Sequence, residues 1–148
     1  TKRIADMIAK TTGGTEYEII PARSYPRDFK TTSEVAQREL DENARPKIKN
    51  PLPDVSGYNT VFVGAPVWWG DYPMVVHTFL DAVDLNGKNV VPFATSEGSG
   101  LGNFDSVLSS QYPNAKVLEG HFERGKDVAD RRSSVESNVN RWLNGLGY

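Results

Sequence analysis

Two uncharged, apolar segments constrain the fold of this chain more than any other feature. Residues 60–65 and 89–94 carry no charge and consist largely of β-branched, aromatic or small side chains. A strand that lacks polar alternation is buried on both faces, as in parallel sheets covered by helices on both sides. Amphipathic segments follow both runs, at residues 73–83 and 103–111. The pattern therefore predicts an α/β protein built as a three-layer α-β-α sandwich.

The remaining segments continue the alternation of helices and strands. Residues 16–20 alternate polar and apolar side chains before a proline, which predicts an edge strand. Pro92 is awkward within the second apolar run, because proline cannot donate to a ladder, and we expect it near the end of the strand or at a bulge. The other predicted elements are helices at residues 1–10, 31–44 and 128–146 and a strand at residues 115–122. Nothing resembles a repeat or a linker, so residues 1–148 are predicted to form a single domain.

Composition excludes several classes of function. The chain has no cysteine, which excludes a disulfide scaffold, a cysteine-based zinc site and a thiolate nucleophile. Its 17 basic and 19 acidic side chains form no long basic cluster, so nucleic acid is not an expected partner. The uncharged stretches are too short or too rich in Gly and Pro to span a bilayer, so no membrane role is expected. The absence of cysteine fits a reducing compartment, and we expect a cytoplasmic protein.

The first of two unusual loops, residues 65–73, follows the first apolar run and is named here the tryptophan loop. It places Trp68, Trp69 and Tyr72 in a short turn. Two adjacent tryptophans at the end of a strand cannot both point into one core face. At least one is expected to meet a ligand, a partner or solvent. The alternative is that both indoles close the top of the sheet.

The second loop, residues 95–103, follows the second apolar run and is named here the glycine loop. Its sequence, Thr-Ser-Glu-Gly-Ser-Gly-Leu-Gly-Asn, offers backbone N–H groups that side chains do not obstruct, together with three hydroxyls. Such a loop can approach a planar polar ring edge or an anion closely, although it can also be a flexible turn. Loops at the carboxyl ends of neighbouring parallel strands share one edge of the sheet. The two loops together predict a cleft for a flat aromatic ligand.

Competing motifs fail on spacing. Gly98 and Gly100 are followed by Asn103 where a dinucleotide fingerprint needs a third Gly or Ala. Ser99 lacks the flanking glycines of a nucleophile elbow, and no Walker-type sequence occurs. His77 and the other histidine, His121, have no spacing that supports a metal site or a triad. We expect both to be structural or exposed, and no catalytic or metal-binding residue is predicted.

The two loop motifs, Pro-Val-Trp-Trp-Gly and Ser-Glu-Gly-Ser-Gly-Leu-Gly, occur in this order, and the whole chain closely resembles the flavodoxin family, in particular its short bacterial members. The resemblance implies a flavodoxin-like sheet with strand order 2-1-3-4-5 and non-covalently bound FMN. It implies that one side of the isoalloxazine ring is bordered by Pro66, Val67, Trp68, Trp69 and Gly70. It also implies that the pyrimidine edge of the ring meets Thr95, Ser96, Glu97, Gly98, Ser99 and Gly100.

The start of the chain departs from the family pattern. Family members begin with a hydrophobic strand and a Ser/Thr-Gly-Asn-Thr phosphate loop, whereas this sequence starts at the last threonine of that loop. Of three explanations, omitted upstream residues, a strand from a partner chain or closure of the sheet to four strands, we expect the first. Only Thr1, with Lys2 nearby, then remains to hold the FMN phosphate at the start of the first helix. Weak flavin binding by this chain is therefore expected.

The resemblance favours FMN-dependent electron transfer, with a redox protein or a small-molecule donor or acceptor as partner. Two alternatives stay open. One is a flavin-dependent NAD(P)H:quinone-type oxidoreductase, and the other is an interaction domain that has lost FMN together with the phosphate loop. A homodimer is among the assemblies that the sequence leaves open.

Overall fold

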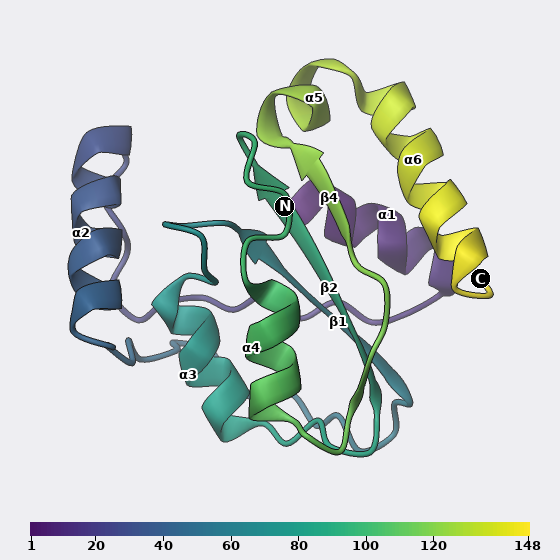
Figure 1. Cartoon of the computed structure of the whole chain (residues 1–148), viewed down its shortest axis with the longest axis horizontal. Helices are drawn as coiled ribbons and strands as arrows, with labels where there is room; N and C mark the ends of the chain where they lie inside the picture. Colours follow the sequence, from purple (N-terminus) through teal and green to yellow (C-terminus); the bar gives the residue numbers. More distant parts are fainter.

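The computed structural model describes residues 1–148 and has helices on both sides of an open parallel sheet (Figure 1). No helix combines the length and the apolar composition that crossing a membrane requires. The helices are α1 (Lys2–Thr12), α2 (Phe29–Asp41), α3 (Met74–Ala82), α4 (Phe104–Gln111), α5 (Gly125–Asp130) and α6 (Arg132–Gly145). The strands are β1 (Thr60–Pro66), β2 (Asn89–Ser96), β3 (Lys116–Val117) and β4 (His121–Arg124).

The sheet is parallel throughout, as predicted. β1 pairs with β2 from Thr60 opposite Asn89 to Pro66 opposite Thr95. On its other side β2 pairs first with β3 and then with β4. Because all these strands run in one direction, the two loops that follow β1 and β2 leave the sheet at the same edge.

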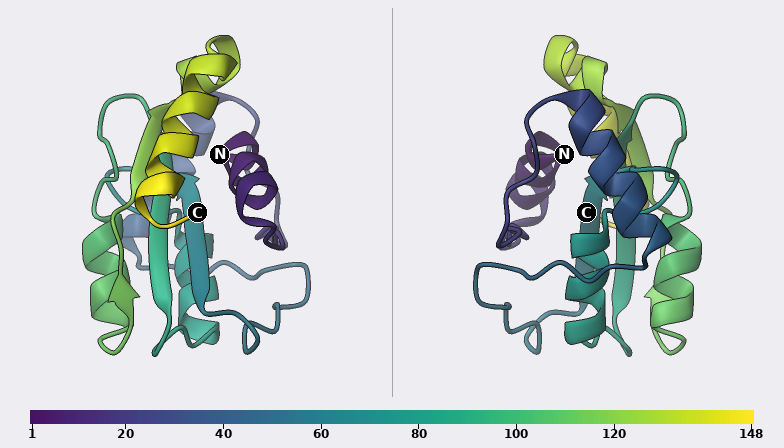
Figure 2. Two further views of the ribbon diagram at one scale, coloured as in Figure 1. Left: turned by 90° about the vertical axis from the view of Figure 1, so that its right-hand side faces the viewer. Right: turned by 90° about the vertical axis from the view of Figure 1, so that its left-hand side faces the viewer.

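Helices cover both faces of the sheet, which confirms the predicted three-layer architecture. Figure 2 shows α1 and α4 on opposite sides of the strands. The core under α1 also contains residues of α6, and the core under α4 also contains residues of α3. Alternate residues of β2 serve the two layers: Val91 and Phe93 belong to the core under α1 and α6, whereas Val90 and Ala94 belong to the core under α3 and α4. This double burial is the reason that the run carries no charge.

The predicted strand at residues 115–122 forms as two separate pieces, β3 and β4. The irregular stretch between them lies opposite the middle of β2, where Pro92 has no N–H to donate. Gly120 lies there so close that an added Cβ would be 2.6 Å from the Pro92 carbonyl oxygen. Pro92 is therefore buried within the strand and not near its end. The alternative placement at a bulge agrees with the structure, because residues 118–120 lie opposite residues 91–92, so the neighbouring strand carries one extra residue here. The proline is accommodated by an interruption in the neighbouring strand.

The predicted edge strand at residues 16–20 is not part of the sheet. Its backbone is held by a loop instead, because Lys49 N donates to Ile20 O at 2.7 Å and the Asn50 side chain bonds Ile20 N and Glu18 O. Pro21 forms only an isolated bridge with Ile48. The segment packs its apolar side over α3, where Tyr17 lies 5.7 Å from the ring of Phe79. Alternation of polar and apolar residues therefore predicted correctly which side of this segment is buried. It wrongly predicted that the segment pairs with a strand of the sheet.

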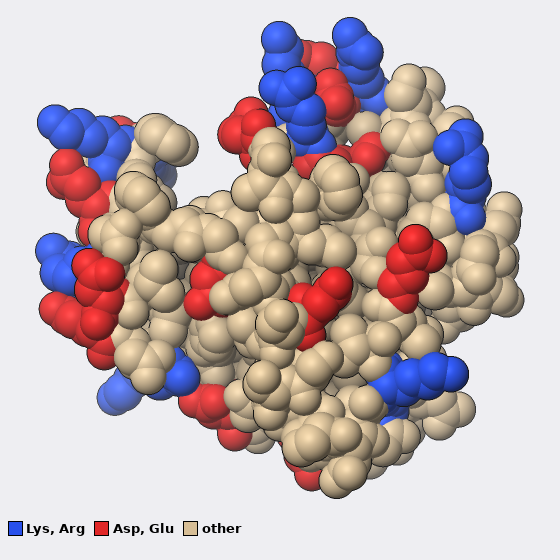
Figure 3. All heavy atoms as spheres, in the orientation of Figure 1, with Lys and Arg blue, Asp and Glu red and all other residues tan.

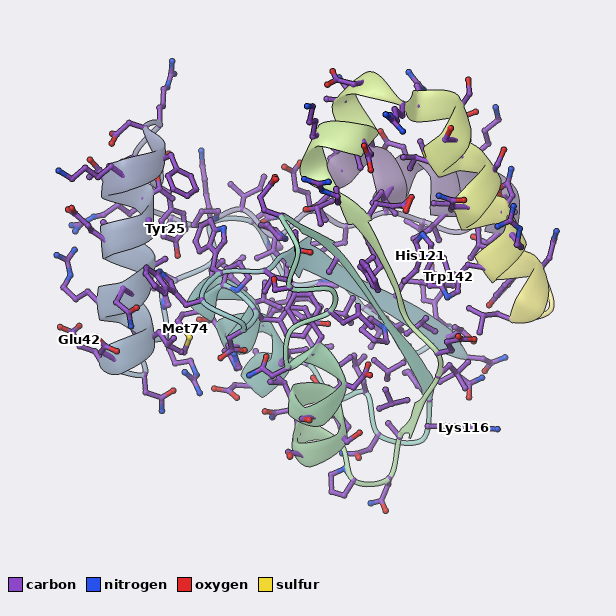
Figure 4. All side chains as sticks on the ribbon, turned by 45° about the horizontal axis from the view of Figure 1, so that its top comes forward. Tyr25, Glu42, Met74, Lys116, His121 and Trp142 are labelled. Atoms are coloured by element: carbon purple, nitrogen blue, oxygen red, sulfur yellow. The ribbon has the colours of Figure 1, made fainter.

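Two helix boundaries also differ from the sequence-based prediction. α2 starts earlier than expected, because the Asp28 carboxylate accepts a hydrogen bond from Thr31 N at 2.8 Å and caps the helix. The predicted last helix is broken at Arg131 into α5 and α6. Under α6, His121 stacks on Trp142 with ring centroids 5.0 Å apart (Figure 4). Burial lowers the pKa of His121 despite the nearby Glu123 carboxylate, which agrees with a structural role.

Candidate functional site

The tryptophan loop and the glycine loop meet at the carboxyl edge of the sheet. At the base of the loops Val67 N donates to Thr95 O at 3.0 Å, and at their far ends Asn103 N donates to Gly70 O at 2.8 Å. Gly102 is packed so tightly that an added Cβ would lie 2.5 Å from Gly70 O. The structure thus brings together the predicted site residues that follow β1 with those that follow β2.

Neither tryptophan is sealed inside the core. Trp68 is half-buried and meets Tyr25 edge to face at a centroid distance of 4.9 Å. Trp69 is 55% exposed, has a φ of 53°, and donates from Nε1 to Ser33 O at 2.9 Å. A non-glycine residue in this left-handed region costs roughly 1–2 kcal/mol, so the surrounding contacts must hold it there. The alternative that both indoles close the top of the sheet is therefore wrong.

Sequence reasoning missed the contribution of the segment around α2. Tyr25 and Ser33 hold the two indoles, and Figure 4 shows Tyr25 between α2 and the rest of the molecule. A groove of about 690 Å³ follows α2 as far as Trp69. Charged side chains of both signs lie along this helix (Figure 3). The one sequence signal was that Tyr25 is an aromatic residue in a polar, proline-containing segment. This signal does not identify its partner, Trp68, because the two residues lie far apart in the chain.

The glycine loop is open on one side and polar at its base. Glu97, Gly98 and Ser99 are exposed, and no atom lies within 4 Å of the position that a Cβ on Gly98 would take. Ser96 is buried, and its hydroxyl has no hydrogen-bond partner. An unpaired buried hydroxyl is unfavourable by about 1–3 kcal/mol and is a natural contact for a ligand. The Glu97 carboxylate points toward Gly125, because a Cβ there would lie 3.2 Å from Oε1.

The start of α1 lies at the same edge of the sheet, where Figure 1 marks the N-terminus beside β2. The Thr1 hydroxyl is hydrogen-bonded to that of Thr95 at 2.5 Å and does not cap the helix. No acidic side chain lies in the first turn, so the positive end of the helix is not neutralised locally. Lys2 is not brought to the loops by any contact. Its ammonium lies 3.5 Å from Asp6, one turn further along the helix.

Asp71 is a buried carboxylate that sequence reasoning did not select. Its Oδ1 accepts from Tyr72 N at 2.7 Å and from His77 Nε2 at 2.9 Å. With the Asn103 amide oriented toward it, Nδ2 donates to the same oxygen at 3.0 Å. A sequence signal existed, because Asp71 is the only Asp, Glu, Lys or Arg in residues 55–80. Burial by itself would raise the pKa of Asp71, but these donors outweigh it and hold the pKa below 3.8.

Acid is therefore expected to weaken the hydrogen bonds around Asp71. A carboxyl whose folded pKa is depressed stabilises the protein above its unfolded pKa, and that contribution is lost as the pH falls below 3.8. At pH 7, Asp71→Asn should be less stable than the wild type by about 1–2 kcal/mol, the difference between charged and neutral hydrogen bonds. Urea unfolding between pH 7 and pH 3 should show this gap closing at the acidic end. A gap that stays constant over the range would contradict the assignment.

Parallel strands with converging loops at their carboxyl edge define the class of α/β proteins that bind ligands at that edge. Within this class, residues 1–145 match the family model described as flavodoxin, and the chain belongs to the flavodoxin family. No match was found among curated protein sequences.

Solved structures agree with this assignment. The chain is 32% identical to a candidate flavoprotein from Bacteroides eggerthii, with a TM-score of 0.80 over 100% of this chain and 91% of the other. It is 30% identical to a candidate flavoprotein from Bacteroides uniformis, with a TM-score of 0.82 over 97% and 90%. A flavoprotein from Lactobacillus acidophilus, solved in complex with FMN, shares the fold at 22% identity, with a TM-score of 0.65 over 88% and 89%.

Proposed function

We propose that this chain binds FMN non-covalently between the tryptophan loop and the glycine loop and transfers electrons through it. The observation that carries the proposal is the meeting of these loops at the carboxyl edge, with two accessible indoles on one side and an open polar loop on the other. The family assignment and the FMN complex of the Lactobacillus acidophilus flavoprotein support the choice of cofactor.

The residues present fit the ring of FMN. Trp68 and Trp69 provide apolar faces suited to a flat tricyclic ring. Opposite them, the exposed backbone around Gly98 can donate to ring oxygens and nitrogens without steric hindrance. Ser96 supplies a buried hydroxyl that has no other partner. The other residues that we propose to border the ring are Pro66, Val67, Gly70, Thr95, Glu97, Ser99 and Gly100.

The start of α1 fits the phosphate. Backbone N–H groups of a first helical turn have no intrahelical partners and favour an anion. Thr1 and Thr95 add two hydroxyls at this point, already in contact with each other. We propose Thr1 and the first turn of α1 as the phosphate contacts of this chain. Lys2 would contribute through its backbone N–H, since its ammonium lies beside Asp6.

Bound FMN supplies one- and two-electron redox chemistry, and the protein orients the ring and limits access of water to it. The half-buried Trp68 excludes water from one side of the proposed cleft. The exposed indole of Trp69, at the end of the groove along α2, leaves a route to the ring for a redox protein or a small donor or acceptor. We propose such a molecule as the physiological partner.

An FMN titration tests the proposal. Quenching of flavin fluorescence by the wild-type chain should be saturable, and Trp68→Leu should weaken binding about 10–100-fold, in line with the loss of one stacked aromatic partner. Trp142→Phe is the matched control, because that indole lies under α6 and stacks on His121. Absence of saturable quenching by the wild type, or equal affinities of both variants, would contradict the site.

A kinetic assay distinguishes the two redox functions. Steady consumption of NAD(P)H with a quinone would identify an oxidoreductase instead of a carrier.

A further inference from the structure

One carboxylate oxygen connects three parts of the molecule around the proposed cleft. Asp71 Oδ1 accepts from Tyr72 N in its own loop, from His77 Nε2 on α3, and from Asn103 Nδ2 at the end of the glycine loop. The Asn103 amide also donates to Gly70 O at 3.1 Å. The two loops are thus joined by side chains in addition to their backbone contacts.

The anchor of this network is rigid. Only 13% of the Asp71 side chain is exposed, and the same fraction of the His77 side chain. Tyr72 is buried, and its hydroxyl donates to Val63 O at 3.0 Å. The tryptophan loop is therefore fixed to β1 and α3 at Asp71, next to the exposed Trp69 and Gly70.

The glycine loop is more exposed than the end of the tryptophan loop that contains Asp71. Residues 97–99 are exposed, and Asn103, which precedes α4, is exposed as well. Asn103 does not cap α4 with its side chain. Its amide is instead directed at Asp71 and Gly70, so it holds the other loop and not its own helix.

We propose that Asp71 and Asn103 are positioning residues that couple the tryptophan loop to the glycine loop, so that both open and close as one unit and together set the affinity for FMN. The coupling between the loops does not depend on bound FMN. Its effect on the affinity for FMN rests on the proposed function. Neither residue is assigned a contact with the ring.

Hydrogen exchange of the protein without FMN tests the coupling. Asn103→Ala removes the amide but keeps the backbone bond from Asn103 N to Gly70 O, so the fold should persist. Loss of a hydrogen bond to a charged group should speed amide exchange about tenfold in both loops, residues 66–72 and 96–103. Asn86→Ala is the matched control. Asn86 is also exposed and donates to a carboxylate, Asp84 Oδ1, at the opposite edge of the sheet. Faster exchange in the glycine loop alone, or in neither loop, would overturn the proposal.

A second pair of variants tests the carboxylate oxygen itself. Asp71→Asn keeps a neutral acceptor at this position, so it should lose less protection in both loops than Asp71→Ala does. Equal exchange in these two variants would contradict the role of Asp71. In the FMN titration, Asn103→Ala should raise Kd about tenfold, while Asn86→Ala stays within twofold of the wild type. If the wild type does not bind FMN, the proposed function fails, and the exchange experiment still decides whether the loops are coupled.

Discussion

Gly102→Ala is expected to lower the affinity for FMN at least 100-fold and to destabilise the fold by about 2–4 kcal/mol. The added Cβ would lie 2.5 Å from Gly70 O and 3.0 Å from Val67 Cγ1, and the residue has a φ of +55°. A backbone oxygen cannot move aside as a flexible side chain can. The glycine loop must therefore separate from the tryptophan loop, and the proposed cleft loses its shape. Urea unfolding and an FMN titration measure the two effects.

Gly87→Ala separates the two causes of this loss. Gly87 has a φ of +81°, but no atom lies within 4 Å of its Cβ position, and it lies at the opposite edge of the sheet. This control should cost only the strain of a left-handed residue, roughly 1–2 kcal/mol, and leave FMN affinity within twofold. Equal stability and equal affinity of the two variants would show that the contact between Gly102 and Gly70 does not matter.

Phe104→Ala is expected to destabilise the protein by about 3–5 kcal/mol, the usual range for removal of a fully buried phenylalanine. Phe104 is 0% exposed and stacks on Tyr72 with ring centroids 3.5 Å apart. These two rings lie at the ends of the glycine loop and the tryptophan loop. The variant therefore removes the ring contact that supports both loops from below. FMN affinity should fall about tenfold or more as well.

Phe79→Ala is the comparison for Phe104→Ala. Phe79 is 5% exposed and lies on α3 in the same core, but it packs on Tyr17 away from the two loops. The two variants should lose similar amounts of stability in urea unfolding. Only Phe104→Ala should weaken FMN binding under conditions in which both variants are folded. Similar FMN affinities would show that the stacked pair supports the core alone.

The meeting of the two loops at one edge of the sheet was predictable because it follows from strand direction. β1 and β2 are uncharged runs buried on both faces, which indicates a parallel sheet, and parallel strands end at one edge. That at least one of Trp68 and Trp69 remains accessible also followed from their adjacency. The flavodoxin resemblance of the two loop motifs agreed with the family assignment over residues 1–145.

Features that depend on distant partners were not predictable in the same way. Residues 16–20 have the alternation of a strand, but their backbone groups bind the loop that contains Asn50. Tyr25 and Ser33 hold the indoles from a segment more than 30 residues away in the chain. Asp71 acquires its depressed pKa only when His77 and Asn103 are brought to it.

The sequence by itself determined the α/β class, the parallel β1–β2 pair and the presence of two unusual loops at one edge of the sheet. These features depend on side-chain periodicity and on local backbone preferences, both of which act over a few residues. Only the tertiary structure decided which buried polar groups are satisfied, which strand is interrupted opposite Pro92, and which side chains connect the loops. Such hydrogen bonds join residues far apart in the chain, and their geometry exists only after the helices have packed on the sheet.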